Sequence, residues 1–140
     1  MADKQISNDA ILERLNAIPS VQTFHYRVEE LSPGRAVVVA PYDQKLDGIF
    51  GSFHGGLLAT LADSTGGTAA LTIVGPETPT ATTDLSIRYL APCRTDARAT
   101  ATVIKAGRTL VVVGIEVHDT NGRHVATCQA SYICMHSKKR

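Results

Sequence analysis

The sequence has little charge of either sign, few cysteines and no long apolar run in its first 20 residues. Its 14 lysines and arginines nearly balance 13 acidic residues, which leaves a net charge of +1. A chain without a basic excess gives no support for a nucleic-acid surface, so no nucleic acid is expected as a partner. Three cysteines without paired spacing exclude a disulfide framework and favour a reducing cytoplasm. The first 20 residues lack the continuous apolar core of a secretory signal.

Common catalytic and metal-binding motifs are also missing. No ligand spacing suggests a metal site, and neither a metal nor another cofactor is expected. The stretch "GSFHGG" has neither the spacing of a dinucleotide fingerprint nor the lysine of a phosphate-binding loop. The G-x-S-x-G elbow of serine hydrolases does not occur. Cys128 and Cys134 lie in a strand-like run with no evident base, so they are expected as small core residues.

What is present indicates one folded domain over residues 1–140. The chain is 44% hydrophobic and 19% charged, a composition typical of globular proteins. Residues 1–19 are expected to form an N-terminal helical segment, because residues 8–18 carry apolar side chains at helical spacing and Pro19 stops the run. The basic residues 137–140 are expected to be a flexible tail.

The pattern of strands predicts an α+β domain with a mostly antiparallel sheet of about six strands. Residues 21–31 and 35–42 are expected to pair as strands, joined at Ser32-Pro33-Gly34, and residues 43–53 to form a loop. Four consecutive strands are then expected over residues 80–92, 97–107, 109–119 and 123–135. One long helix between the two groups of strands is expected at the centre of the domain.

That helix lies in "FGSFHGGLLATLADSTGGTAALTIVG", residues 50–75, which is small and apolar except for one acid, Asp63. A charge at the middle of a bilayer is costly, so a buried helix is expected here and a membrane span is not. Both faces are apolar or small, which predicts a helix buried nearly all round. Gly66 and Gly67 cost ~1 kcal/mol each relative to alanine, and we expect them to leave the carboxylate of Asp63 uncovered.

The start of the helix offers a second chemical feature. Free backbone N–H groups at His54-Gly55-Gly56 can polarise a carbonyl oxygen, and the glycines leave them accessible to a ligand. Gly55 and Asp63 are eight residues apart, or ~12 Å along the axis. One chain therefore cannot bring the two together. A joint site requires the helix start of one subunit and the acid of another in a symmetric dimer.

These residues also carry a resemblance to a known family. "GSFHGGLLATLAD" followed by "TATTDLSIRYLAP" closely resembles the hotdog-fold acyl-CoA thioesterases, over residues 20–135, and most closely the phenylacetate-pathway and 4-hydroxybenzoyl-CoA branch. The resemblance implies that Asp63 acts as general base or nucleophile and that the Gly55 N–H polarises the thioester carbonyl. It further implies that His54 shapes the turn and that Thr82 supports the reactive group. Dimers that share one long sheet, commonly paired into tetramers, are also implied.

The chain departs from the family at one position. The family commonly has Asn or Gln six residues before its histidine, whereas this chain has Gly48, with Asp47 beside it. A carboxylate cannot donate the same hydrogen bond unless it is protonated. Three residues are expected to bind substrate near the thioester: Gly48, Phe50 and Gly56. Phe53 is a further candidate for the acyl pocket, and Arg88 and Arg108 are expected at the coenzyme A phosphates. The alternative for both phenylalanines is a core or dimer contact, and the alternative for both arginines is an ordinary surface position.

The sequence thus predicts a cytoplasmic enzyme that hydrolyses an acyl- or aryl-CoA thioester to a free acid and coenzyme A. The acyl-CoA is its expected partner, and neither a membrane nor a nucleic acid is. A non-catalytic acyl-CoA binder on the same fold is the alternative, favoured by Gly48 in place of the usual amide. A hydratase or dehydratase relative is a weaker alternative, because the "HGG…LAD" pattern argues against it.

Overall fold

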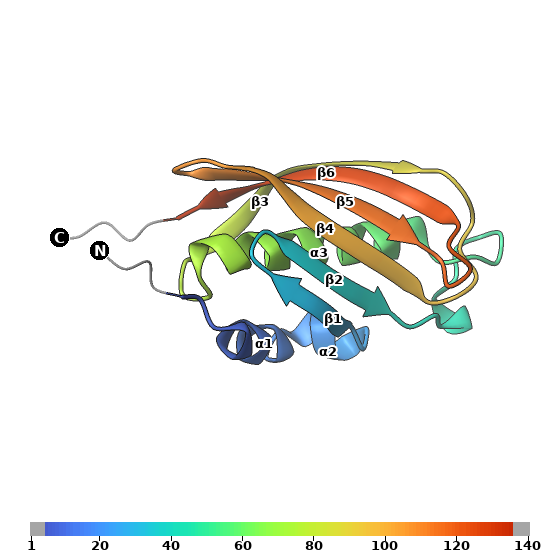
Figure 1. The fold of residues 1–140 in the computed structure, drawn as a ribbon. Helices are drawn as coiled ribbons and strands as arrows, with labels where there is room; N and C mark the ends of the chain where they lie inside the picture. The colour runs from blue at the N-terminus through green and yellow to red at the C-terminus, as the bar shows by residue number, and fades with distance from the viewer. Residues whose placement is uncertain (1–4, 136–140) are drawn as a thin grey trace.

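The computed structural model describes residues 5–135 and contains one six-stranded antiparallel sheet around a long helix (Figure 1). The strands follow the spatial order β1-β2-β4-β5-β6-β3, and every neighbouring pair is antiparallel. Their bounds are β1 Arg27–Ser32, β2 Arg35–Ala40, β3 Thr80–Tyr89, β4 Ala97–Ala106, β5 Leu110–His118 and β6 His124–Cys134. The predicted α+β class and the predicted sheet are confirmed.

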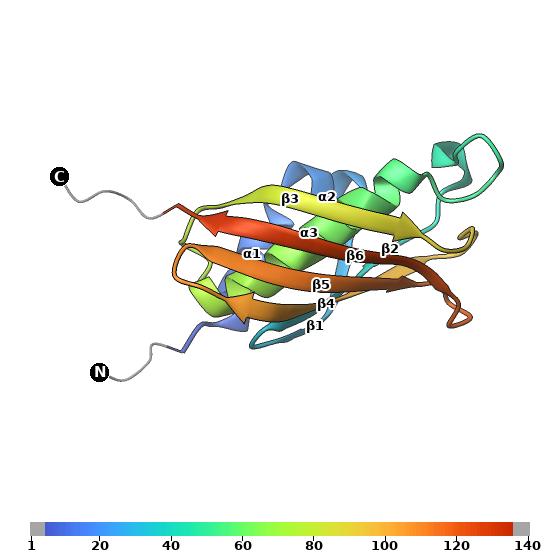
Figure 2. The ribbon, with the colours of Figure 1, turned by 90° about the horizontal axis from the view of Figure 1, so that it is seen from above.

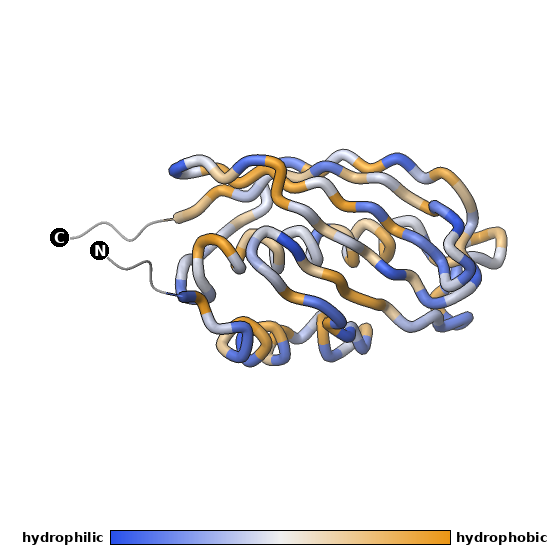
Figure 3. The backbone as a smooth tube through the Cα atoms, in the orientation of Figure 1, coloured by the Kyte–Doolittle hydropathy of each residue, from blue (hydrophilic) through white to orange (hydrophobic). Residues whose placement is uncertain are grey.

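The central helix, α3, runs over Gly55–Val74 and crosses the strands diagonally beneath the sheet (Figure 2). It contacts all six strands, so its small and apolar side chains become part of the core. By length and hydropathy α3 could also cross a membrane, but a core helix meets the same criteria. Buried and more exposed residues alternate along β5, as a sheet with one face on the core requires, whereas β2 is apolar at every position after Arg35 (Figure 3).

Two short helices complete the fold on the side of α3 away from the sheet. The helix predicted over residues 8–18 is observed as α1, Asn8–Asn16, and Ser7 caps it by accepting a hydrogen bond from the Ala10 N–H. The strand predicted from residue 21 is wrong in its first half. Pro19 begins a second helix, α2, Pro19–Thr23, because its fixed φ suits the first turn of a helix. β1 therefore starts only at Arg27.

The loop before α3 holds one turn of 3₁₀ helix, Gln44–Leu46. It ends at His54, which lies just before α3. The predicted hairpin at residues 32–34 is confirmed, with Ser32 paired to Arg35 across the turn and Gly34 at φ 77°. The tail predicted at residues 137–140 lies outside the described residues.

β3 forms one edge of the sheet and bears on the site more than the other strands. It has ten residues, most of them exposed, and within the described part of the chain it pairs only with β6. Its register shifts between Thr82 and Asp84, so Thr83 forms a β-bulge. A long exposed edge with unpaired backbone groups is a surface on which another strand can pair.

Candidate active site

His54 sets the geometry of the N-terminus of α3. Its Nδ1 atom accepts a hydrogen bond from the Gly56 N–H at 3.0 Å, which makes His54 the N-cap of the helix. Its carbonyl oxygen accepts from the N–H groups of Leu57 and Leu58. The Gly55 N–H, by contrast, donates to no acceptor within residues 5–135. The first glycine of the predicted pair is therefore the one whose N–H is available for a ligand, and the Gly56 N–H is already occupied.

Gly55 also has a steric reason to be glycine. The hydroxyl of Tyr89, at the end of β3, donates to the Gly55 carbonyl oxygen at 2.6 Å. A Cβ atom on Gly55 would lie 3.2 Å from Cζ of Tyr89, closer than ordinary packing allows. Tyr89 is 51% exposed despite this contact. The edge strand therefore meets the start of α3 at Tyr89 and leaves one side of that contact open.

Asp63 lies two turns further along α3 and is half-buried. Its Oδ1 accepts a hydrogen bond of 2.7 Å from the hydroxyl of Thr82. Its Oδ2 has no hydrogen-bond partner among the described residues. The structure thus brings Thr82 to Asp63, as the family resemblance implied, and leaves one carboxylate oxygen free to accept a proton or to attack.

Asp63 opens onto a cavity of about 220 Å³. One wall comes from α3, β2, β3 and β6, and the other comes from α1, α2 and β1. The apolar lining residues are Leu15, Ile18, Val21, Tyr26, Val28, Val38 and Leu71, and the polar side comprises Asp63, Ser64, Thr68, Thr80, Thr82 and Tyr132, with Gly67 beside them. An apolar cavity with a few convergent polar groups at one side is the usual form of a small-molecule site.

Tyr132 on β6 is a site residue that the sequence analysis missed. Its hydroxyl donates to the Asp63 carbonyl oxygen at 2.8 Å, and it is the cross-strand partner of Thr82. Burial, and after it the nearby Asp63 carboxylate, raises the pKa of Tyr132 above its usual range, so the phenol stays protonated and remains a donor. Its only sequence signal is a tyrosine on the inward phase of the last strand.

Gly66 and Gly67 do not share the single role that was predicted for both of them. A Cβ atom on Gly66 would lie 2.3 Å from the hydroxyl oxygen of Tyr132. Gly66 therefore makes room for Tyr132, and it is buried beneath that ring. A Cβ atom on Gly67 would make only an ordinary contact of 3.5 Å, and Gly67 lines the cavity beside Asp63. The prediction of an uncovered acid fits Gly67 and is wrong for Gly66.

The loop before α3 contains Gly48, the position at which this chain departs from the family pattern. The Gly48 N–H donates to the Ser52 carbonyl oxygen, so it has no side chain and no free donor. Asp47 accepts from the Tyr42 hydroxyl at 2.7 Å through Oδ2, and its buried Oδ1 has no partner within the described residues. The hydrogen bond to Asp47 raises the pKa of Tyr42. Neither residue 47 nor residue 48 supplies the amide donor that the family commonly has.

The remaining candidates for substrate binding are spread over the surface. Phe50 is 89% exposed and does not line the cavity beside Asp63, whereas Phe53 is half-buried and packs against Tyr42. Arg88 is exposed on β3, and Arg108 is exposed in the turn between β4 and β5. The protomer therefore does not gather these four residues around Asp63.

The prediction that Cys128 and Cys134 are core residues is confirmed, and Cys93 is a third buried cysteine. Cys93, Cys128 and Cys134 are free thiols and all are buried. Burial, followed by the nearby Asp63 carboxylate, raises the pKa of Cys128 to about 11. Burial also raises the pKa of Cys93. At neutral pH these two thiols are protonated and poor nucleophiles.

The free Gly55 N–H and the free oxygen of Asp63 lie on the same helix, eight residues or ~12 Å apart. The sequence profile of the thioesterase superfamily matches residues 50–126, which include both groups and Thr82. The chain belongs to the thioesterase superfamily. Membership of this superfamily makes it a thioester hydrolase in class, and its six-stranded sheet around α3 is the hotdog thioesterase fold.

Similar proteins agree with this assignment. A protein of Saccharolobus solfataricus, named as a candidate esterase, is 34% identical over 113 residues, which cover 80% of each chain. Human acyl-coenzyme A thioesterase 13 is 31% identical over 88 residues, 61% of this chain and 62% of its own. The crystal structure of a thioesterase family protein from Silicibacter pomeroyi superimposes with a TM-score of 0.87 at 28% identity, covering 92% of this chain and 98% of that one.

Proposed function

We propose that this protein hydrolyses acyl-CoA thioesters at a site shared by two protomers. One observation carries the proposal: a free carboxylate oxygen and a free amide N–H lie ~12 Å apart on one helix, beside an exposed edge strand. A thioester carbonyl bound at the Gly55 N–H lies far from Asp63 of the same chain. A second protomer that supplies the other group completes the site.

The edge strand suggests how the two protomers pair. Thr82 contacts Asp63 near the start of β3, and Tyr89 contacts Gly55 at its end. If β3 pairs antiparallel with its own copy around a two-fold axis, the start of one strand lies beside the end of the other. Asp63 of one protomer then approaches the partner's Gly55. The same pairing joins the two sheets into one, and pairing of such dimers into tetramers is part of the proposal.

The chemistry follows from these positions. The Gly55 N–H donates to the thioester carbonyl oxygen and stabilises the oxyanion that forms when the carbonyl carbon becomes tetrahedral. Asp63 either takes a proton from the attacking water or attacks the carbon itself, after which water releases the acid. The C–S bond breaks, coenzyme A leaves as a thiolate and takes a proton. Thr82 holds the carboxylate of Asp63 in place.

Thiol release from a panel of short, long and aryl acyl-CoA substrates tests the proposal. We expect Asp63→Asn to lower kcat by ~10²–10⁴-fold, the usual contribution of a positioned base, with the oligomer unchanged in light scattering. Full turnover by Asp63→Asn would remove Asp63 from the mechanism. Tight acyl-CoA binding by the wild-type protein without any thiol release would favour the alternative, a non-catalytic binder, which the missing amide at Gly48 supports.

Two finer assignments also stay proposals. The "HGG" and "LAD" spacing supports membership of the phenylacetate-pathway and 4-hydroxybenzoyl-CoA branch. The three buried free thiols support a cytoplasmic location, because a reducing compartment keeps cysteines unpaired.

A further inference from the structure

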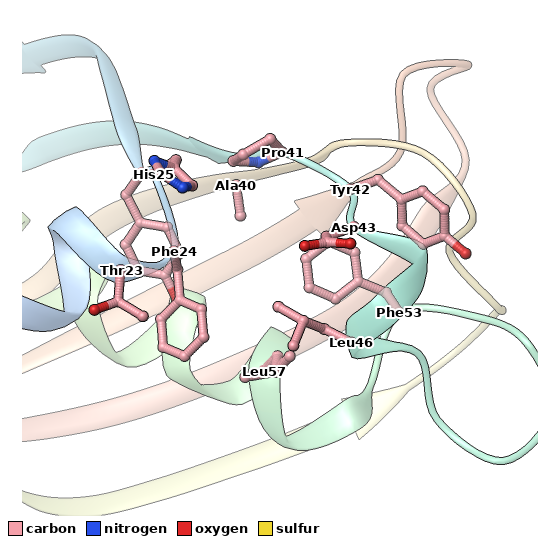
Figure 4. A pocket seen from close by; sticks show the side chains of 11 residues that line it. Thr23, Phe24, His25, Ala40, Pro41, Tyr42, Asp43, Leu46, Phe53 and Leu57 are labelled. Atoms are coloured by element: carbon pink, nitrogen blue, oxygen red, sulfur yellow. The ribbon is translucent and has the colours of Figure 1, made fainter.

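A second cavity lies next to the one that holds Asp63. It measures about 230 Å³, and aromatic side chains make up much of its wall, among them Phe24, Tyr42 and Phe53. Figure 4 shows Phe24, Leu46, Phe53 and Leu57 converging on this aromatic cavity from different parts of the chain. Nothing in the hydrolytic site described above uses it.

The two cavities follow one groove between α3 and β2. Leu57 lines the aromatic cavity, whereas Ser64 and Leu71 line the cavity beside Asp63. These three residues are spaced by seven along α3, so they share one face of the helix. On β2, Ala40 lines the first cavity and Val38 the second, again on one face of the strand.

Among residues 5–135, Tyr26 is the single residue that lines both cavities. It follows α2 and precedes β1, and its ring stacks on Phe24 with the ring centres 5.9 Å apart. Its hydroxyl makes no hydrogen bond to any of residues 5–135, so packing and not polar bonding holds the ring. Burial raises the pKa of Tyr26 to about 12, which keeps the hydroxyl neutral. An unbonded ring between two cavities can be replaced without breaking a hydrogen bond.

We infer that Tyr26 ends the acyl pocket and thereby restricts the enzyme to compact acyl groups. This rests on the proposed acyl-CoA hydrolysis. Each cavity alone, at about 220 and 230 Å³, is smaller than the ~300–1,000 Å³ of typical ligand sites, whereas the two joined would fall within that range. The apolar wall from α1, α2 and β1 holds a short aliphatic chain or a single ring. The aromatic cavity lies beyond Tyr26 on the same faces of α3 and β2.

Replacing Tyr26 tests the inference. We would measure kcat/KM on straight-chain acyl-CoAs from acetyl to tetradecanoyl for wild type, Tyr26→Phe and Tyr26→Ala. Tyr26→Ala should move the longest accepted chain upward by several carbons. The gain should be about fourfold for each further buried methylene, which corresponds to ~0.8 kcal/mol. Tyr26→Phe keeps the ring and should keep the wild-type limit. Tyr26→Leu, a smaller change to the core, should give an intermediate limit and serves if the alanine variant does not fold.

Leu46 provides the matched control, because it lines only the aromatic cavity. Leu46→Trp should leave the wild-type profile unchanged, since Tyr26 already closes off that cavity. In the Tyr26→Ala background the same substitution should shorten the accepted chain again, a coupling that independent sites would not show. An equal loss at every chain length in Tyr26→Ala, or a shift as large in Tyr26→Phe, would overturn the inference.

Binding separates failure of this inference from failure of the proposed reaction. The dissociation constants of the same acyl-CoA series are measured on Asp63→Asn, with and without Tyr26→Ala. If wild type releases no thiol from any substrate, hydrolysis is wrong, but a longer chain preference in binding after Tyr26→Ala still supports the pocket. If hydrolysis occurs and neither binding nor kcat/KM changes its length preference, Tyr26 is not the wall.

Discussion

Gly66 in α3 makes room for the tyrosine that hydrogen-bonds to the backbone of Asp63. The ring of Tyr132 lies directly over it, and the Tyr132 hydroxyl reaches the Asp63 carbonyl oxygen across the space that a side chain would occupy. We expect Gly66→Ala to lower the free energy of unfolding by ~1–3 kcal/mol, the usual cost of overpacking a core. Urea denaturation followed by circular dichroism would measure it.

Gly67 is the matched control for this prediction. It lies in the same helix one residue later, but its added Cβ would make only a contact of 3.5 Å. Gly67→Ala should therefore raise the free energy of unfolding by up to ~1 kcal/mol, because alanine is the better helix former. Equal stability of the two alanine variants would mean that the contact with Tyr132 does not require glycine at position 66.

Thr82 shows which part of the site was predictable at this scale and which was not. Strict alternation along β3 places residues 82 and 84 on one face, opposite Leu85 and Ile87, which pack on the core. The bulge at Thr83 reverses the phase, so Thr82 points inward to Asp63. Family resemblance identified Thr82, but periodicity alone would have placed it outside. Tyr132 was missed because its role depends on a contact between residues 69 positions apart.

Among the elements, α3 was predicted best and the segment after Pro19 worst. His54, Gly55 and the final Gly75 bound α3 where the sequence indicated, because capping and chain reversal are local properties. Residues 21–26 were expected to be the first half of a strand, yet residues 19–26 form α2 and a turn, in which His25 has φ 55°. The apolar residues of that segment do not distinguish a short helix from a strand, and tertiary packing decides. The cavity wall that they form was therefore not predictable from the sequence.

The start of α3 supports a prediction about the oxyanion. Gly55 is the first residue of the helix, a position that accepts proline, and its N–H has no partner within the described residues. Gly55→Pro should remove this donor while keeping the helix, and lower kcat by ~10²–10³-fold, as loss of one oxyanion donor does. Gly55→Ala adds a comparable Cβ next to Tyr89 but retains the N–H, so its kcat should stay much closer to wild type. Comparable losses in both variants would assign the effect to the clash with Tyr89.

For the whole molecule, the proposed function places activity in the assembly and not in the protomer, because Gly55 and Asp63 lie ~12 Å apart on one helix beside the exposed edge of β3. Two inactive variants can then restore each other. In a mixed dimer of Asp63→Asn and Gly55→Pro, one site carries both substitutions, while the other combines an intact Asp63 with an intact Gly55.

Co-refolding the two variants in equal amounts tests this directly. Random pairing makes half of the dimers mixed, each with one intact site of two, so about a quarter of wild-type activity should return. The control is a double variant with both substitutions in one chain, co-refolded with wild type. With a shared site, each mixed dimer of this control has no intact site, because each of its two sites receives one substituted residue, so only the wild-type dimers, about a quarter of the total, should be active. Complete sites within single protomers would instead leave about half of the activity. If the two single variants stay inactive together although light scattering and mass spectrometry show mixed dimers, each protomer holds a complete site of its own and the shared arrangement is wrong.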